Sequence, residues 1–222
     1  MRKIVVGAFV SLDGVMQAPG GPEEDPSGGF RFGGWVFPYW DEPMGQYMSE
    51  LFEAEFDLLL GRRTYEIFAA YWPFIEDDPI ADRFNAVTKF VVTSSAEPLA
   101  WHSSVAIRGD VPAELARLKQ EDGPQLLVQG SSVLNHALFA HGLVDELQLL
   151  TFPVLLGGGK RLFDEGSMPS GLKLVDSRTS TTGVVMARYR PDGEVRTGSF
   201  AADEPSEAEL TRRKKWQKEE AA

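Results

Sequence analysis

The 222-residue sequence predicts an α/β fold with a mixed, mostly parallel sheet of about eight strands, helices on both faces and an antiparallel C-terminal hairpin. Two observations support this prediction. Short apolar runs alternate with segments of helical periodicity over most of the chain, which is typical of parallel strands joined by helices. The last two strand patterns are separated only by a turn at Thr182-Gly183, which predicts a hairpin at the edge of the sheet.

The expected strands are short runs rich in apolar and β-branched residues, bounded by glycine, proline or polar residues. They cover residues 3–10, 56–60, 89–93, 105–107, 125–129, 146–152, 173–180 and 184–190. Apolar residues at helical spacing predict the helices between them. The helices cover residues 42–55, a segment that starts at 64, and residues 81–86, 112–119 and 133–140.

A long connection between residues 15 and 43 combines repeated glycine and proline with many aromatic residues. A loop of this length inside one domain is usually functional or disordered, and its aromatic content argues against disorder. The aromatic residues between Phe30 and Trp40 suit two roles. They can stack on a flat heterocycle or act as a lid, or they can pack on the core or on a second subunit.

The expected organisation is one domain over residues 1–190 followed by a polar tail over residues 191–222. Ser206-Glu207-Ala208-Glu209 matches a capping box, which is compatible with a short helix. The polar composition of this segment favours a solvated or partly disordered tail over that helix.

Composition excludes several classes of protein. The net charge of −11 disfavours general binding to nucleic acid. The absence of cysteine excludes disulfides and thiolate metal sites, and is compatible with a reducing cytosol. No apolar run is long enough to cross a bilayer, and the apolar start ends at Ser11-Leu12-Asp13-Gly14 without a cleavage site. We therefore expect a cytoplasmic protein with no membrane or nucleic-acid partner.

Familiar catalytic motifs are missing from the sequence. Gly159-Lys160 lacks the other residues of a phosphate-binding P-loop, and no G-x-G-x-x-G pattern follows a strand. His136 and His141 lie five residues apart, which does not place them on one helical face, and we expect no metal site. No G-x-S-x-G elbow of a serine hydrolase occurs.

The segment Gly61-Arg62-Arg63-Thr64 joins a buried strand directly to a helix. The first N–H groups of a helix lack internal acceptors, and the helix dipole adds positive charge there, so this junction suits an anion. Glycine allows close approach, Thr64 offers a hydroxyl, and Arg62 or Arg63 can clamp a phosphate. The alternative is a capped helix whose arginines are merely solvated.

Two more strands end in polar residues. Gln129-Gly130-Ser131-Ser132 is a second strand-to-helix junction, for which an ordinary serine cap is the alternative. Thr93-Ser94-Ser95 ends a third strand. Polar groups at one edge of an open α/β sheet lie where such proteins bind ligands. The three strand ends together predict a ligand site more strongly than any one of them.

The sequence resembles the dihydrofolate-reductase-like family that includes the reductase domain of the bifunctional riboflavin-biosynthesis protein. The matching segments run in family order from about residue 1 to residue 190. They are Ser11–Gly14, Leu60–Glu66, Val128–Ser132, Leu143–Leu147 and Pro153–Phe163. The resemblance implies the corresponding fold, a homodimer and a site for NADPH.

The resemblance also implies which residues bind the cofactor. The phosphate-binding junction of the family corresponds to Gly61, Arg62, Arg63 and Thr64. The end of the strand near the adenosine phosphate corresponds to Thr93 and Ser94. The helix start at the pyrophosphate corresponds to Gly130, Ser131 and Ser132. Arginines at the adenosine end favour NADPH over NADH, because a fork of donors suits the extra phosphate.

The substrate side is predicted more loosely. Asp13 corresponds to a position beside the nicotinamide, where it orients a substrate or relays a proton; a simple Asp-Gly turn is the alternative. Trp35 in the aromatic loop, and Gly158 and Lys160 in the glycine-rich turn, are candidate substrate contacts. The acidic residue that dihydrofolate reductases carry in a pocket helix has no assigned counterpart among Glu50, Glu53 and Glu55, which puts dihydrofolate itself in doubt.

The leading hypothesis is therefore an NADPH-dependent reductase of a small pyrimidine or pterin-like heterocycle. Reduction of 5-amino-6-(5-phosphoribosylamino)uracil is the reaction that the resemblance names. A nucleotide-binding or flavin-binding module without catalytic activity is the alternative, because a fold alone does not fix an activity.

Overall fold

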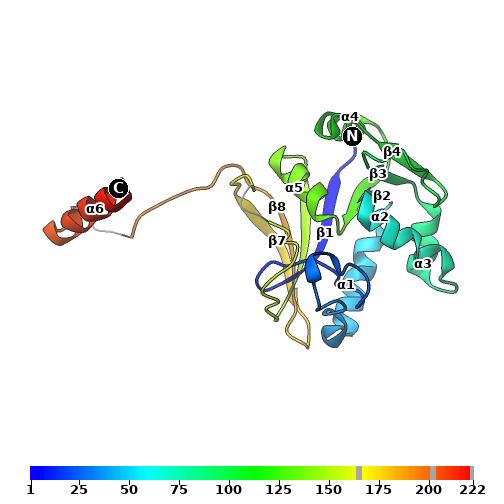
Figure 1. The fold of residues 1–222 in the computed structure, drawn as a ribbon, viewed down its shortest axis with the longest axis horizontal. Coiled ribbons are helices and arrows are strands. Elements are labelled where there is room, and N and C mark those ends of the chain that lie inside the picture. Colours follow the sequence, from blue (N-terminus) through cyan, green and yellow to red (C-terminus); the bar gives the residue numbers. More distant parts are fainter. Residues whose placement is uncertain (164–166, 201–203, 221–222) are drawn as a thin grey trace.

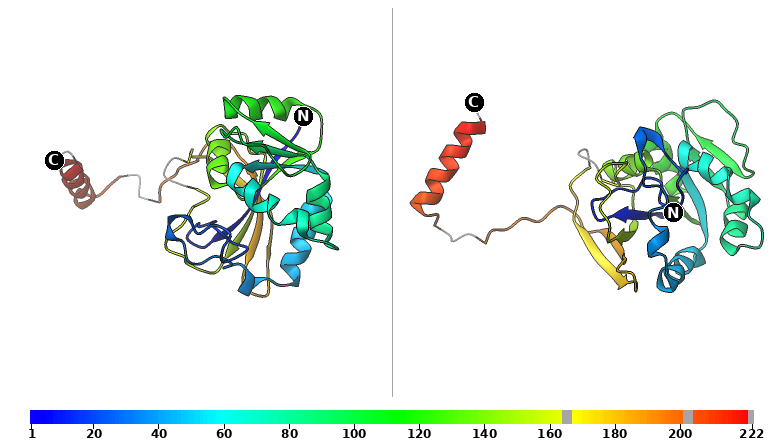
Figure 2. Two further views of the ribbon diagram at one scale, coloured as in Figure 1. Left: turned by 45° about the vertical axis from the view of Figure 1, so that its right-hand side comes forward. Right: turned by 60° about the horizontal axis from the view of Figure 1, so that its bottom comes forward.

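The computed structural model of the chain describes residues 1–163, 167–200 and 204–220. Its sheet has eight strands in the order β4-β3-β2-β5-β1-β6-β8-β7. The six strands from β4 to β6 are parallel, β8 runs antiparallel to β6, and β7 pairs antiparallel with β8 at the edge. Figures 1 and 2 show this sheet with helices packed against it. The predicted fold class is thus confirmed.

Every expected strand and helix is present, with shifts of one or two residues at most ends. The strands are β1 (Ile4–Ser11), β2 (Phe56–Gly61), β3 (Lys89–Val92), β4 (Ser104–Ile107), β5 (Gln125–Gln129), β6 (Glu146–Phe152), β7 (Leu172–Thr179) and β8 (Val185–Pro191). The helices are α1 (Glu42–Glu53), α2 (Arg62–Ala69), α3 (Pro79–Ala86), α4 (Val111–Gln120), α5 (Ser132–Ala140) and α6 (Glu207–Glu220).

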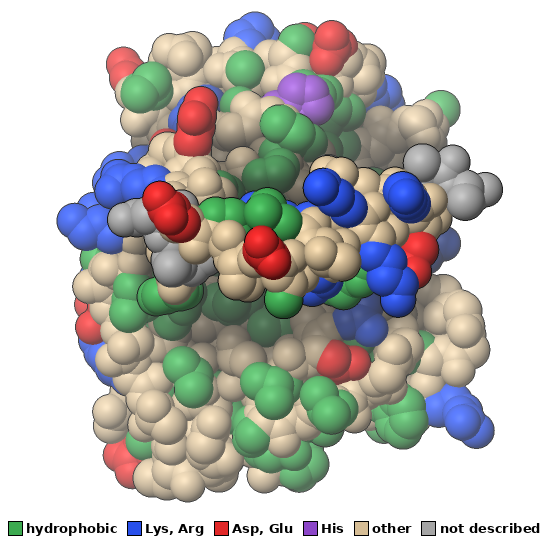
Figure 3. Space-filling model, turned by 90° about the vertical axis from the view of Figure 1, so that its left-hand side faces the viewer, with side chains coloured by type: hydrophobic (Ala, Val, Ile, Leu, Met, Phe, Trp, Pro, Cys, Tyr) green, Lys and Arg blue, Asp and Glu red, His purple; other side chains and the backbone are tan. Residues whose placement is uncertain are grey.

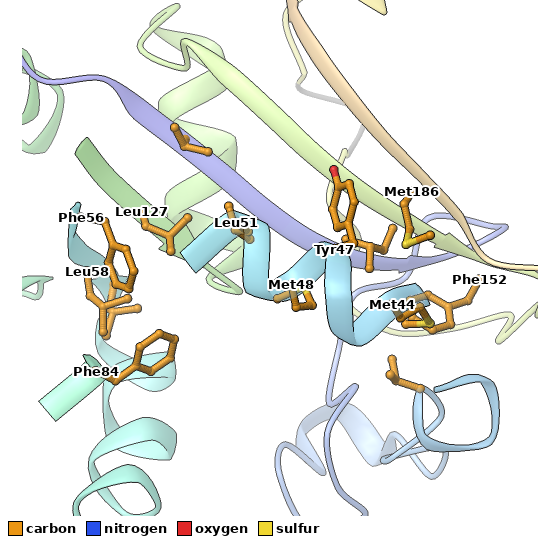
Figure 4. Packing of buried hydrophobic residues seen from close by; sticks show 14 of the residues in the cluster. Met44, Tyr47, Met48, Leu51, Phe56, Leu58, Phe84, Leu127, Phe152 and Met186 are labelled. Carbon is orange, nitrogen blue, oxygen red and sulfur yellow. The ribbon is translucent and has the colours of Figure 1, made fainter. Parts of the chain in front are cut away.

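Two hydrophobic clusters lie on opposite faces of the sheet. The first contains buried residues of α1, α2 and α3, such as Met44, Tyr65 and Phe84, packed on the sheet. Figure 4 shows part of this cluster under α1. The second contains buried residues of α4 and α5, such as Leu115 and Leu138. The helices therefore cover both faces of the sheet, as apolar parallel strands require.

The long connection after β1 is ordered into two short 3-10 turns, Ser27–Gly29 and Phe37–Tyr39. Its aromatic residues divide into two groups. Trp35 is buried, whereas Phe37 and Trp40 are exposed. Trp35 packs edge-on against Phe152 with 5.1 Å between ring centroids. Part of the loop thus belongs to the core.

The polar tail contains α6, which begins directly after Ser206. The Ser206 hydroxyl accepts a hydrogen bond of 3.3 Å from the backbone N–H of Glu209. In Figure 1 the helix is drawn away from the sheet. Figure 3 shows acidic and basic side chains mixed along it. Residues 201–203 and 221–222 of the predicted tail lie outside the described residues. None of the helices within the described ranges has the length and apolar character needed to span a membrane.

Candidate functional site

The carboxyl ends of β2 and β5 form a switch point in the sheet. The two strands are parallel neighbours. The helix that follows β2, α2, packs on one face of the sheet, and the helix that follows β5, α5, packs on the other. Open α/β sheets bind ligands at such switch points, because the chain diverges there and leaves backbone groups accessible. The junctions at Gly61 and Gly130 lie at this place.

Ser131 connects the two junctions. Its hydroxyl accepts a hydrogen bond of 2.9 Å from the backbone N–H of Gly61 and donates one of 2.8 Å to the Thr64 hydroxyl. Gly130 has a φ of +69°, a conformation that favours glycine, and a Cβ there would lie 3.3 Å from Cγ2 of Thr64. The structure therefore brings Gly61, Thr64, Gly130 and Ser131 together, with Ser132 as the first residue of α5.

The helices at these junctions differ from the others in how they begin. Asp41, Asp78 and Asp110 accept hydrogen bonds from the first-turn N–H groups of α1, α3 and α4. Within the described residues, no side chain caps α2 or α5 in this way. The N-terminal N–H groups of these two helices therefore remain available to an anion, and the helix dipoles favour one there. The serine-cap alternative for α5 does not hold, because the Ser131 hydroxyl bonds to Gly61 and Thr64 instead.

The two arginines of the first junction have different surroundings. Arg62 is held by Glu66 at 2.6 Å and by Glu97 at 3.0 Å, and these pairings raise its pKa further. Arg63 is exposed and makes one long hydrogen bond, of 3.5 Å, to the hydroxyl of Ser27. Arg63 is thus the better placed of the two to bind an added phosphate, because doing so breaks no ion pair.

Thr93 and Ser94 follow β3, the neighbour of β2 on its other side. Gly61 pairs with Val92 in the sheet, so these residues lie beside the first junction. Thr93 is buried, and its hydroxyl accepts a hydrogen bond of 3.0 Å from the N–H of Ser95, whereas Ser94 is exposed. The two residues therefore differ in access, and Ser94 presents the more accessible hydroxyl at this strand end.

Asp13 fastens the turn after β1 to the glycine-rich turn. Its carboxylate accepts hydrogen bonds from the Ser11 hydroxyl (2.5 Å) and from the backbone N–H groups of Leu156 (3.2 Å) and Gly157 (2.9 Å). Desolvation raises the pKa of Asp13, but these hydrogen bonds outweigh it and leave the pKa below its ordinary value. An ionised, hydrogen-bonded carboxylate suits orientation of a loop better than donation of a proton.

The predicted substrate contacts lie near this turn, but not all are free. Trp35 is buried, and its indole N–H donates to the carbonyl of Gln17 at 2.8 Å, so it supports the site from inside the core. Lys160 forms an ion pair with Asp25, and its backbone N–H donates to Gln17 Oε1 at 3.0 Å. Gly158 is exposed. The structure thus places Gly158 at the surface and holds Trp35 and Lys160 in internal contacts.

Gln129 belongs to the second junction but was not among the residues predicted to bind cofactor or substrate. It ends β5 directly before Gly130, and its Nε2 is buried without a hydrogen-bond partner among the described residues. The amide lies over Gly7 of β1, where a Cβ would be only 2.5 Å from Nε2. A polar residue at the carboxyl end of a strand with an apolar centre, directly before the glycine of the junction, was the available signal. A buried donor without an acceptor, next to the switch point, is a candidate substrate contact.

The acidic residues of α1 lie on its outer side. An open depression of about 720 Å³ runs along this side, and its lining residues include Trp40, Glu50 and Glu53. Glu50 forms an ion pair of 2.7 Å with Arg178. This depression contains none of the junction residues, and its openness to solvent makes it less suited than the switch point to enclosing a cofactor.

Comparisons with known proteins agree with this fold. The model of the RibD C-terminal domain matches residues 2–186. Two proteins of Bacillus subtilis strain 168 described as uncharacterized are similar in sequence. YyaP is 26% identical over 200 residues, covering 86% of this chain and 96% of its own. YwjB is 28% identical over 173 residues, covering 78% of this chain and 89% of its own.

Two solved structures extend the comparison. A putative riboflavin biosynthesis protein from Shewanella sp. PV-4 has a TM-score of 0.57 and 20% identity, with 86% of this chain and 99% of that chain covered. Dihydrofolate reductase from Enterococcus faecalis, complexed with NADP(H) and RAB-propyl, has a TM-score of 0.54 and 15% identity, with 86% and 96% covered. The chain has a reductase-type fold, that of dihydrofolate reductase, and it belongs to the RibD C-terminal domain family.

Proposed function

We propose that the protein is an NADPH-dependent reductase of a small heterocyclic substrate of the pyrimidine or pterin type. The observation that carries the proposal is the pair of uncapped helix starts at the switch point between β2 and β5. Three other helices of the domain begin with an aspartate cap, so the missing caps are confined to the junctions where a phosphate-bearing cofactor fits.

The donor set at the junctions suits a dinucleotide with an additional phosphate. The uncapped N-terminal N–H groups of α2 and α5 are the candidate donors to the pyrophosphate, and Gly130, with its φ of +69°, allows close approach there. Arg63 is exposed and has no ion pair among the described residues, so its guanidinium is the candidate partner of the extra phosphate that distinguishes NADPH from NADH. The Enterococcus dihydrofolate reductase, which has this fold, was solved with NADP(H).

When bound, NADPH supplies a hydride, and the protein supplies orientation and exclusion of water. The Gln129 amide offers a donor for a carbonyl or ring-nitrogen acceptor of the substrate. Asp13 holds the turn at Gly157 against the end of β1 and so shapes the opposite side of the site. These roles suit a polar heterocycle that carries hydrogen-bond acceptors, as a pyrimidine does. A solved structure described as a pyrimidine reductase-like protein from Corynebacterium diphtheriae shares the fold, with a TM-score of 0.57.

The decisive experiment titrates the full chain with NADPH and with NADH, and then follows the absorbance of NADPH with pyrimidine and pterin substrates. We expect saturable binding that is tighter for NADPH, followed by substrate-dependent oxidation. The variant Gln129→Leu should raise KM about tenfold without changing the Kd for NADPH, since it removes one hydrogen bond. Gln125→Leu, at the opposite end of β5, is the matched control.

Three outcomes would contradict the proposal. Absence of saturable NADPH binding removes the cofactor assignment. Binding without turnover of any of these substrates indicates a nucleotide-binding module without catalysis. A purified protein that carries a yellow chromophore indicates a flavin-binding module instead.

A further inference from the structure

A small polar cavity lies under α1, on the part of the sheet formed by the antiparallel strands. In the sheet register, Gln148 of β6 pairs with Arg188 of β8, and Arg188 pairs with Asp176 of β7. Tyr47 of α1 covers this row from above. The cavity has a volume of about 50 Å³. Its lining residues are Tyr47, Glu50, Leu51, Gln148, Asp176, Arg178 and Arg188.

Two donors face this cavity without an acceptor. The hydroxyl of Tyr47 and Nε of Arg188 are both buried, and neither has a hydrogen-bond partner among residues 1–163, 167–200 and 204–220. The Tyr47 side chain is 5% exposed, and its hydroxyl points away from Met44 and Phe152 toward the strands (Figure 4). Buried donors of this kind are rare, because each unpaired one costs about 1–3 kcal/mol.

The two carboxylates of the cavity, those of Glu50 and Asp176, form ion pairs with Arg178 and not with Arg188. Arg178 lies 2.7 Å from Glu50 and 3.4 Å from Asp176. The guanidinium of Arg188, which is half-buried and always charged, forms no ion pair within the part of the chain that the structure describes. A partly buried charge is costly unless an opposite charge accompanies it. The cavity thus contains two guanidiniums and two carboxylates, but neither carboxylate lies within ion-pair distance of Arg188, whose Nε has no acceptor.

We propose that this cavity binds a small anion, such as chloride, bromide or formate, through the Tyr47 hydroxyl and Arg188 Nε. An anion supplies the lone pairs that both donors lack and a negative charge in direct contact with the Arg188 guanidinium. The volume suits a species of one to a few heavy atoms, since the share of one water in the liquid is about 30 Å³. Gln148 also lines the cavity, and one N–H of its Nε2 donates to Glu146 Oε1 at 3.1 Å.

The residues around the cavity determine how tightly the anion binds and which part of the fold it stabilises. Burial raises the pKa of Tyr47 to about 12, so its hydroxyl remains a donor at neutral pH. The nearby carboxylates of Glu50 and Asp176 repel an anion, and we expect affinity in the millimolar range. Because Tyr47 belongs to α1 and Arg188 to β8, the bound anion stabilises the packing of α1 on the antiparallel strands.

The direct test soaks crystals of the full chain in sodium bromide and locates bromide by its anomalous scattering. We expect a peak in contact with both Tyr47 Oη and Arg188 Nε. A well-ordered water, an empty cavity, or bromide bound only elsewhere on the surface would overturn the proposal. No cofactor is present in this experiment, so its result is independent of the proposed reductase activity.

A second arm measures thermal unfolding in sodium bromide and in sodium gluconate of equal ionic strength, since gluconate is too large for the cavity. The quantity compared is the rise in Tm on replacing gluconate with bromide, at bromide concentrations well above Kd. This rise should be about 2–4 °C larger for the wild type than for Tyr47→Phe or Arg188→Met. Arg190→Met, which removes an arginine of the same strand that pairs with Glu146 at 3.0 Å, should retain the wild-type response. An undiminished response in Tyr47→Phe and Arg188→Met would refute the assignment.

Discussion

The hydroxyl of Ser131 donates a hydrogen bond of 2.8 Å to the hydroxyl of Thr64, across 67 residues of sequence. The same oxygen accepts the N–H of Gly61 at 2.9 Å. One side chain thereby sets the distance between the starts of α2 and α5, the two helices whose N-terminal N–H groups have no side-chain cap among the described residues. The geometry of the candidate cofactor site depends on this bridge.

Replacing Ser131 should loosen both junctions. Ser131 has a φ of +62°, so Ser131→Gly removes the hydroxyl without adding backbone strain. We expect a loss of about 1–2 kcal/mol in the free energy of unfolding, because the Gly61 N–H and the Thr64 hydroxyl lose a partner. Urea denaturation measures this loss, and NADPH titration should show a higher Kd. Ser49→Ala, at an exposed site of α1, should change neither value measurably.

Gly130→Ala should weaken cofactor binding by crowding Thr64. An added Cβ would lie 3.3 Å from Thr64 Cγ2, at a φ of +69° that costs about 1–2 kcal/mol for a non-glycine residue. Gly142→Ala is the matched control, since Gly142 has a φ of +60° and open space around it. We expect the first variant to lose more stability and to bind NADPH more weakly. Equal effects of the two variants would show that contact with Thr64 is unimportant.

Arg63 and Arg62 should contribute unequally to cofactor choice. Arg63→Gln should raise the Kd for NADPH about tenfold and leave the Kd for NADH nearly unchanged, because only NADPH has the extra phosphate. Arg62→Gln should have a smaller effect on NADPH, since Arg62 is already paired with Glu66 and Glu97. Parallel titrations with both cofactors test this ranking. A larger effect of Arg62→Gln would reverse the assignment.

Lys89 should make stability depend on pH in a defined direction. Burial lowers the pKa of this lysine from its ordinary value of 10.5 to about 8. Between these values the folded state binds fewer protons than the unfolded state, so the free energy of unfolding rises with pH. Below about pH 8 the full cost of the buried charge remains, up to roughly 3 kcal/mol, and it is absent above about pH 10.5.

The corresponding measurement is denaturation of wild type and Lys89→Met from pH 7 to pH 10.5. The variant should lose the rise in stability over this interval, while Lys3→Met, at an exposed position, should keep it. The Lys89 ammonium also donates to the Asn85 carbonyl at 2.7 Å and lies 4.3 Å from the Trp101 ring centroid. These contacts reduce the size of the effect but leave its sign unchanged. A wild-type curve that is flat or falls with pH would contradict the expectation.

The sequence by itself determined the order of the elements and the positions of the junctions. Apolar runs such as residues 125–129 and 146–152 became strands with the expected bounds, because burial on both faces leaves a local pattern. Gly61, Thr64, Gly130 and Ser131 could be assigned to the two junctions from sequence, because glycine and hydroxyl residues between a strand and a helix have a local physical meaning. The strand order that makes β2 and β5 neighbours comes from nonlocal pairing.

Only the tertiary structure decided which side chains remain available to a ligand. Arg62 and Arg63 are adjacent and chemically identical, yet Arg62 forms ion pairs with Glu66 and Glu97, whereas Arg63 makes one long hydrogen bond to Ser27. For Trp35 the sequence left open a substrate contact and packing on the core, and the structure packs it on Phe152, since an aromatic residue in a loop carries no signal of the direction it faces. The unpaired donors of Gln129, Tyr47 and Arg188 depend on what surrounds them in space, and sequence spacing does not encode that.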